Sequence, residues 1–334
     1  MARIFLPSFI PIVTTYSVTS PDMPLKELLQ DSSRICDAFL AYQQSAGYDC
    51  IPVMGESTFT AEAFGCRIGL KQHEAFVVKP IVFSSPREIR EYVLPPLDKC
   101  RTIQTFREAI QRLATYSGEK PLVTNSTAPF TTAAKIMGMQ DFLMKTLSEP
   151  ELVRALVEKV TSFIIAITRE LISAGADLIF IADPLASCDI IAPEMFRHLV
   201  YPNLKRIIES IDRPTILHIC GKIDRIAKYM AETGATILSI DHNVRIENIR
   251  DIVGQDVILG GNLDPAGILL KKDPETIAEE ARKCFELAGK DNFILMPGCT
   301  IVPNTPVENI RAMIKVAKER KPGIYFEDER LPRK

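Results

Sequence analysis

The stretch Thr215-Ile-Leu-His-Ile-Cys220 decides the predicted fold, because it is a short apolar run that also carries an imidazole and a thiol. Short runs rich in isoleucine and leucine are typical of parallel strands that are buried on both faces. Seven further runs of this kind occur along the chain, at residues 9–13, 49–53, 121–125, 177–183, 237–241, 257–262 and 293–298. Longer amphipathic segments lie between most of them. The sequence therefore predicts an α/β fold, a closed (β/α)8 barrel of the TIM type.

One connection in this pattern is too long for a single crossover helix. About 65 residues separate the second apolar run from the third, roughly three times a usual connection with one helix. We predict a single barrel domain over residues 1–334 with an insertion at about 55–120. The apolar sequence AFVVKPIVF (75–83) predicts a small hairpin within this insertion.

Composition excludes several classes of protein. The formal net charge is −2 and the chain has no basic run, so we expect no nucleic-acid partner. No stretch approaches 18 uninterrupted apolar residues, so we expect no membrane span. Two prolines interrupt the apolar N-terminal run and no small-residue cleavage site follows it, so we expect mature protein from the first residue. The eight cysteines are then expected to be reduced thiols of a cytoplasmic protein.

Polar side chains gather where the predicted strands end. Active sites of (β/α)8 barrels lie at the C-terminal ends of the strands, so these residues are candidates for a functional site. They are Glu56, Asn125, Asp183, His218, Cys220, Asp241, His242, Asn262 and Cys299.

His218, Cys220 and Cys299 form the most informative subset. Side chains two apart on a strand point to the same face, so His218 and Cys220 lie side by side. Cys299 follows another predicted strand, at residues 293–298. A His/Cys/Cys set suits Zn²⁺ with a fourth position left open. The alternative is a core histidine bonded to a backbone carbonyl beside buried free cysteines, since the spacing is not that of a zinc finger.

Six segments of the sequence resemble the uroporphyrinogen decarboxylase superfamily. They are most similar to its zinc-dependent corrinoid methyltransferases from methylotrophic methanogens, the methylcobalamin:coenzyme M methyltransferases. The resemblance covers most of the chain from residue 50 onward, and it implies a (β/α)8 barrel with His218, Cys220 and Cys299 as the zinc ligands. The segments are AEAFGC (61–66), APFTTAAKIMGMQDFL (128–143), ADPLAS (182–187), ILHICG (216–221), GNLDP (261–265) and PGCTIVPNTPVENIRAM (297–313).

The resemblance also implies a reaction that belongs to methanogenesis. Zinc binds the thiol of coenzyme M, and the thiolate takes a methyl group from a methyl-Co(III) corrinoid, supplied by a corrinoid protein or as free methylcobalamin. A thiol with a pKa near about 8.5 is mostly protonated at neutral pH, and metal binding deprotonates it. Two cysteinates and one neutral histidine leave the zinc site without net charge, so a bound thiolate keeps much of its nucleophilicity.

The carboxylates near the predicted mouth have open interpretations. Asp241 is either a fourth zinc ligand, which a substrate thiol would displace, or a hydrogen-bond partner that orients the ring of His218. Otherwise it is a helix N-cap or a salt-bridge residue. Asp183 either contacts zinc-site residues or holds the barrel mouth, and otherwise is a turn residue before Pro184. Glu62 either faces the cavity or is an exposed residue of a helix.

Two further residues are candidates on the cofactor side of the mouth. Asn262 is expected to fix the loop that follows its strand, and His242 to shuttle a proton unless it is merely solvated. We interpret Cys188 as a spectator. Coenzyme M carries a sulfonate, so a cationic or amide-lined pocket is expected as well.

Three other functions compete with this one. A methyltransferase of the same branch would move the methyl group from a methylated substrate to a corrinoid protein, as in O-demethylation. A uroporphyrinogen decarboxylase proper would carry an arginine-rich segment near its N-terminus, whereas no arginine lies between Arg3 and Arg34 here. A docking scaffold without catalysis would not need the intact His/Cys/Cys set.

Overall fold

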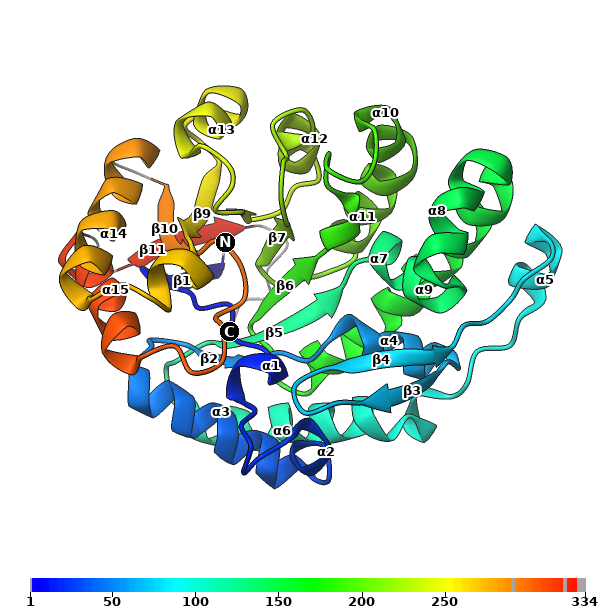
Figure 1. Cartoon of the computed structure of the whole chain (residues 1–334), viewed down its shortest axis with the longest axis horizontal. Coiled ribbons are helices and arrows are strands. Elements are labelled where there is room, and N and C mark those ends of the chain that lie inside the picture. Colours follow the sequence, from blue (N-terminus) through cyan, green and yellow to red (C-terminus); the bar gives the residue numbers. More distant parts are fainter. Residues whose placement is uncertain (1, 290–291, 321–322, 329–334) are drawn as a thin grey trace.

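Seven parallel strands form one curled sheet at the centre of the molecule, in the order β10-β9-β8-β7-β6-β5-β2 (Figure 1). The computed structural model describes residues 2–289, 292–320 and 323–328. Each strand coincides with one of the predicted apolar runs, so the α/β class and the barrel-type fold are confirmed. The strands are β2 (Ile51–Val53), β5 (Leu122–Thr127), β6 (Leu178–Ala182), β7 (Thr215–Ile219), β8 (Ile237–Ile240), β9 (Ile258–Leu263) and β10 (Phe293–Pro297).

The remaining predicted strand, at residues 9–13, is not a continuous strand, yet it occupies the eighth position. Isolated parallel bridges join Phe9 to Leu295 of β10 and Thr14 to Met54, just beyond β2. Pro11 lies between these bridges and has no N–H group, so the segment cannot form an unbroken ladder. The segment therefore closes the gap between the two edge strands of the sheet by a few hydrogen bonds.

Helices surround the sheet on its outer side (Figure 1). The principal ones are α3 (Ser32–Ala46), α6 (Arg101–Tyr116), α9 (Pro150–Ser173), α11 (Tyr201–Glu209), α12 (Ala227–Glu232), α13 (Ile246–Val253), α14 (Pro274–Ala288) and α15 (Val307–Arg320). The shorter ones are α1 (Thr15–Val18), α2 (Leu25–Leu28), α4 (Ser57–Phe64), α5 (Pro86–Glu91), α7 (Pro129–Met137), α8 (Met139–Ser148) and α10 (Pro193–Met195). Four single turns complete them: η1 (Leu97–Lys99), η2 (Pro184–Ala186), η3 (Phe196–Val200) and η4 (Pro265–Leu269).

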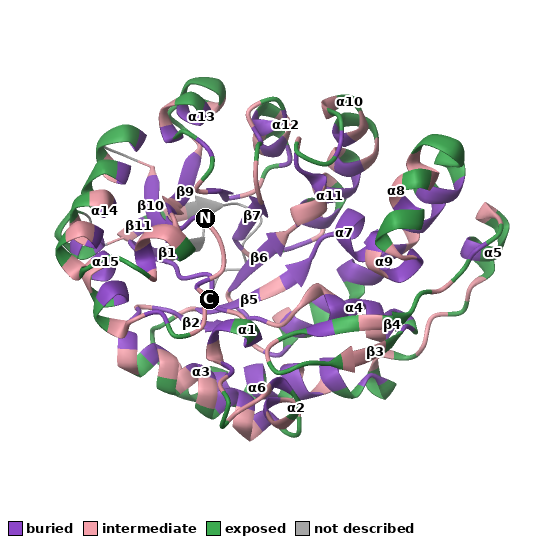
Figure 2. Cartoon of the chain, viewed as in Figure 1, coloured by how far each residue is buried: buried purple, intermediate pink, exposed green. Residues whose placement is uncertain are grey.

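Local sequence signals explain where these helices begin and end. The side chains of Asp31 and Asp273 accept hydrogen bonds from the first turns of α3 and α14. Gly47 ends α3 in the left-handed conformation, with φ of 83°. The strands β7, β8 and β10 are buried along their whole length beneath the helices (Figure 2).

Two small antiparallel sheets differ from the sequence prediction: the first was misplaced and the second was not predicted. A hairpin does occur in the 55–120 segment, but β4 (Ala75–Lys79) pairs with the preceding β3 (Arg67–Leu70). Residues 80–83 are not a strand, and Pro80, which lacks an N–H group, marks the end of β4. The second sheet joins β1 (Ala2–Pro7) to β11 (Gly323–Asp328), so two segments far apart in the chain lie side by side.

Among the described residues, no helix combines the length and the apolar character that crossing a membrane requires.

Arg250 of α13 is a buried cation at the end of the sheet where β9 and β10 begin. Its guanidinium donates hydrogen bonds to the carbonyl oxygens of Ala288, Gly254, Val257 and Asn292, over 2.7 to 3.0 Å. Val257 and Asn292 directly precede β9 and β10. One side chain therefore fixes the starting points of two neighbouring strands.

Replacing Arg250 by leucine should lower the free energy of unfolding by roughly 3 kcal/mol or more, because several carbonyl groups lose their buried donor. Urea unfolding followed by circular dichroism measures this change. Arg245→Leu is the matched control, because Arg245 forms an exposed ion pair with Glu247. The control should change stability by no more than about 0.5 kcal/mol. Equal losses in both variants would contradict the assigned role.

Candidate metal centre

The structure brings His218, Cys220 and Cys299 together at the C-terminal ends of β7 and β10. The Nε2 atom of His218 lies 3.3 Å from the Sγ atom of Cys220, and the two Sγ atoms are 3.9 Å apart. All three ligand atoms lie within 4.8 Å of one another. His218 is buried, whereas both cysteines are half-buried and can be reached from the mouth.

This arrangement fits a tetrahedral zinc ion. With usual Zn–S and Zn–N distances, tetrahedral ligand atoms lie roughly 3.5 to 3.8 Å apart, close to the separations found here. The contact between the two thiols also affects their pKa values in opposite directions. A hydrogen bond from Cys220 lowers the pKa of the Cys299 thiol, while the same contact, together with burial, raises the pKa of Cys220. One thiolate is thus favoured before any cation binds.

The turn after β7 fixes the position of Cys220. Gly221 has φ of 71°, in the left-handed region, and an added Cβ there would meet the Oδ2 atom of Asp189 at 2.3 Å. The same Oδ2 atom accepts a hydrogen bond from the backbone N–H of Lys222, at 2.8 Å. Asp189 therefore braces the turn that follows the first cysteine.

The loop that carries Cys299 is anchored on both sides. Before it, the N–H of Gly298 donates to the carbonyl oxygen of Leu263, at 2.8 Å. After it, the N–H of Ile301 donates to the carbonyl oxygen of Ile12, and the Ser17 hydroxyl donates to the Ile301 carbonyl, at 2.9 and 2.7 Å. The segment that closes the barrel therefore also holds the loop of the second cysteine.

Ser239 of β8 is the partner of the second ring nitrogen of His218. Its Oγ atom lies 3.0 Å from Nδ1. The sequence interpretation considered Asp241 for this role and missed Ser239. A serine inside the apolar run ILSI (237–240) was a usable signal, because a buried hydroxyl needs a partner.

Asp241 lies close to the centre but outside the group of three. Its Oδ1 atom accepts hydrogen bonds from the backbone N–H and the side-chain amide of Asn243, both at 2.8 Å. The same oxygen lies 3.2 Å from Nδ1 of His242, whose ring is half-buried. The carboxylate thus orders the loop after β8, while Nδ1 of His242 forms no hydrogen bond with any described residue despite this proximity.

Asp183 is fully buried and holds helix α7 against the end of β6. It accepts hydrogen bonds from the backbone N–H and hydroxyl of Thr131, at 2.8 and 2.5 Å, and from the N–H of Phe130, at 3.3 Å. Burial raises its pKa to about 6, although these donors act in the opposite direction. The N–H of Asp183 also donates to the carbonyl of His218. This is the position expected of a residue that holds the mouth.

Asn262 and Glu62 lie in different surroundings. The side-chain amide of Asn262 donates to the carbonyl oxygens of Asp241 and Val244, at 3.0 and 2.8 Å. It therefore fixes the loop after β8, and not the loop after its own strand, β9, as the sequence predicted. Glu62 is half-buried in α4. Burial of the Cys100 thiol raises its pKa, and the charge of Glu62 adds a smaller rise. Glu62 therefore lies beside the N-terminus of α6.

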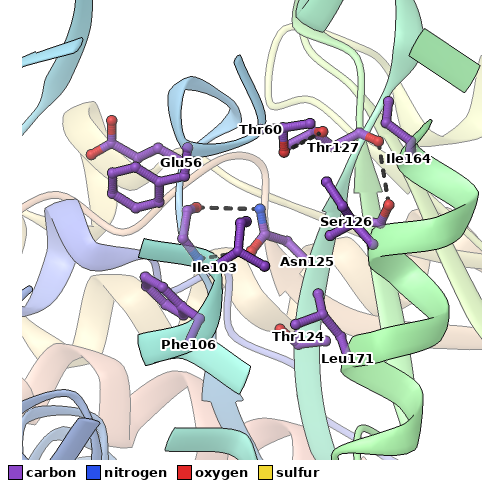
Figure 3. A pocket seen from close by; sticks show the side chains of 13 residues that line it. Glu56, Thr60, Ile103, Phe106, Thr124, Asn125, Ser126, Thr127, Ile164 and Leu171 are labelled. Atoms are coloured by element: carbon purple, nitrogen blue, oxygen red, sulfur yellow. Dashed lines mark hydrogen bonds between the residues drawn. The ribbon is translucent and has the colours of Figure 1, made fainter. Parts of the chain in front are cut away.

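A small cavity of about 30 Å³ lies between α4, α6, α9 and the end of β5, and the metal ligands do not line it (Figure 3). Asn125 spans it by pairing with both backbone groups of Gly55. Glu56, at its edge, accepts hydrogen bonds from the hydroxyl of Thr15 and the N–H of Ala75. The sequence placed Glu56 at a strand end but assigned it no role; the structure shows it tying the hairpin to the mouth.

The chain belongs to the uroporphyrinogen decarboxylase (URO-D) family, whose sequence model matches residues 11–320. Within this family its relatives include methyltransferases. It is 29% identical over 305 residues to the methylated-thiol–coenzyme M methyltransferase of Methanosarcina mazei, covering 91% of this chain and 81% of that protein. It is 32% identical over 284 residues to the methylcobamide:CoM methyltransferase MtbA of Methanosarcina acetivorans, covering 82% and 81%.

A solved structure of a methyltransferase from Methanosarcina mazei has the same fold. Its TM-score is 0.81 at 25% sequence identity, covering 93% of this chain and 94% of that one. Together these relatives identify the chain as an enzyme of the methyltransferase class, as the sequence predicted.

Gly298, in the loop that carries Cys299, allows that loop to approach the loop after β8 closely. Gly298→Ala should separate the two loops. An added Cβ would lie 2.5 Å from the backbone nitrogen and 2.8 Å from the Cβ of His242, so one loop must move and displace Cys299. We expect Zn²⁺ affinity to fall at least about tenfold, measured by competition with a chromophoric chelator. Gly254→Ala, which has φ of 82° and open space around it, is the control. It should cost about 1 kcal/mol of stability but leave Zn²⁺ affinity unchanged.

Proposed function

We propose that this protein is a zinc-dependent methyltransferase that moves a methyl group from a methylated corrinoid to a thiol, with coenzyme M as the acceptor. The single observation that carries the proposal is the gathering of His218, Cys220 and Cys299 within 4.8 Å at the barrel mouth. The names of the relatives, which include coenzyme M and methylcobamide, support the choice of acceptor and donor.

The protein's own ligands would set the charge of the site. When bound, Zn²⁺ supplies the Lewis acidity that keeps a substrate thiol deprotonated at neutral pH. Cys220 and Cys299, as thiolates, and neutral His218 would hold the ion and balance its two positive charges. Three protein ligands leave one position for a substrate thiol. Because the ion and its three protein ligands together would carry no net charge, the substrate thiolate would stay a strong nucleophile toward the methyl group of the corrinoid.

Residues around the ligands would position the substrates and move the proton. We infer that His242, whose Nδ1 atom lies 3.2 Å from Oδ1 of Asp241, accepts the proton that the thiol releases. Asp183 and Asn262 would keep the mouth in shape, through helix α7 and the loop after β8.

The donor and the setting complete the proposal. A corrinoid protein, or free methylcobalamin, would present the methyl group above the half-buried cysteines. All eight cysteines are free thiols in the structure, which supports action in the reducing cytoplasm.

A second candidate reaction uses the same centre in the opposite sense. The relative from Methanosarcina mazei is named for a methylated thiol, so the methyl group could come from a methylated substrate and pass to a corrinoid protein. The ligand set serves both directions, because a thiolate is the nucleophile in one and the leaving group in the other.

Cys220→Ala and Cys299→Ala should each abolish stoichiometric zinc and methyl transfer while the barrel stays folded, because each removes a thiolate ligand. Zinc is measured by atomic absorption after dialysis, and folding by circular dichroism. Cys188→Ala is the control, since Cys188 is also a half-buried cysteine but lies outside the group of three. It should retain zinc. Full zinc content in either ligand variant would sink the metal assignment.

Zinc-loaded protein mixed with methylcobalamin and coenzyme M should convert the corrinoid to cob(I)alamin, followed by its absorbance under anaerobic conditions. A thiol without a sulfonate, such as 2-mercaptoethanol, is the comparison and should react at least about tenfold more slowly at equal concentration. No change with coenzyme M, but formation of methylcobalamin from cob(I)alamin and a methylated thiol, would favour the second reaction.

A further inference from the structure

We propose that Ser239 is a positioning residue that holds the ring of His218 through Nδ1, so that Nε2 faces the other metal ligands. The inference deepens the proposed function and rests on it for the identity of the metal. The orientation of the ring can be tested without any metal.

The geometry follows from the register of two neighbouring strands. His218 of β7 and Ser239 of β8 are Cα partners in the parallel ladder. Both side chains are buried, with Ser239 fully shielded from solvent. Because partners in a ladder point to the same face, the hydroxyl meets the ring from the side, with Oγ 3.0 Å from Nδ1.

A second neighbour restricts the plane of the ring. Phe180 of β6 stacks on His218 with ring centroids 5.7 Å apart and an angle of 27° between the planes. The imidazole is therefore held from β6 by stacking and from β8 by a hydrogen bond. Of these two contacts, only the one with Ser239 distinguishes the ring nitrogens.

The position of the other ring nitrogen, Nε2, shows why the orientation of the His218 ring matters. Nε2 lies 3.3 Å from the Sγ atom of Cys220, on the side where the metal ligands gather. A metal ion needs a lone pair on that nitrogen, so the ring proton must be on Nδ1. In that form Nδ1–H donates to the hydroxyl oxygen of Ser239, and in the other form the hydroxyl donates to Nδ1, so the contact holds the ring with or without metal. The ring is therefore oriented before the ion arrives.

The choice of a hydroxyl has an electrostatic consequence. Asp241 follows Ser239 by two residues, but its carboxylate is directed to Asn243 and His242. A carboxylate on Nδ1 would add negative charge beside two thiolates in a buried site, which is costly. A neutral hydroxyl keeps the ligand set balanced against the charge of Zn²⁺.

The test combines two measurements on the full-length protein with serine replaced by alanine. Ser239→Ala should weaken Zn²⁺ binding by about tenfold to a hundredfold, measured by chelator competition. In ¹⁵N spectra of histidine-labelled, metal-free protein, the Nδ1 signal of wild-type His218, assigned among four histidines with His218→Gln, should show the chemical shift of a hydrogen-bonded nitrogen. In the alanine variant this signal should move, because Nδ1 loses its partner.

Ser126→Ala is the matched control. Ser126 is also a buried serine of the central sheet, and its hydroxyl bonds to that of Thr168 at 2.7 Å. The control loses a comparable hydrogen bond, so it should lose comparable stability but keep wild-type zinc affinity and the His218 spectrum.

The outcomes are separable. If Ser239→Ala keeps both the zinc affinity and the wild-type Nδ1 signal of His218, the inference is overturned. If both serine variants lose zinc equally, Ser239 acts only on stability and the inference is also overturned. If the wild-type protein binds no zinc, the proposed function fails, while the ¹⁵N spectra still decide the role of Ser239.

Discussion

The metal centre depends on the curl of a single parallel sheet. β7 and β10 are not neighbours, since β8 and β9 lie between them, and yet the cysteines that follow these strands meet with their sulfur atoms 3.9 Å apart. A flat sheet would hold such strands roughly 14 Å apart, three times the usual strand spacing. Curvature brings the two strand ends across the barrel toward each other. The distances at the centre therefore report how the whole sheet closes.

Much of this could be predicted from the sequence, because the relevant patterns have short periods. Continuous apolar runs located the seven strands, and the two-residue period of a strand placed His218 beside Cys220. The partner of His218 could not be found in the same way. Ser239 reaches the ring through the register between β7 and β8, and a single sequence gives the period of a strand but not its alignment with the next. The hairpin was misplaced for the same reason, because β4 pairs backward with β3.

The predicted carboxylates divide according to what satisfies them. Asp183 is fully buried and accepts hydrogen bonds from three donors in the first turn of α7, so it holds this helix against the end of β6. Asp241 braces the loop after β8, which Asn262 fixes from the other side. A buried carboxylate must find partners where it stands, and these partners come from the local backbone. Polar residues at strand ends thus include both ligands and braces, and sequence position alone does not separate them.

The closing segment has a consequence for when the centre forms during synthesis. Residues 8–15 are made well before their bridge partner Leu295 and the loop they anchor, around Ile301. Cys220 likewise precedes the third ligand, Cys299, by 79 residues. Throughout that interval of synthesis only two of the three ligands exist. The complete ligand set is therefore coupled to one of the longest-range contacts of the fold.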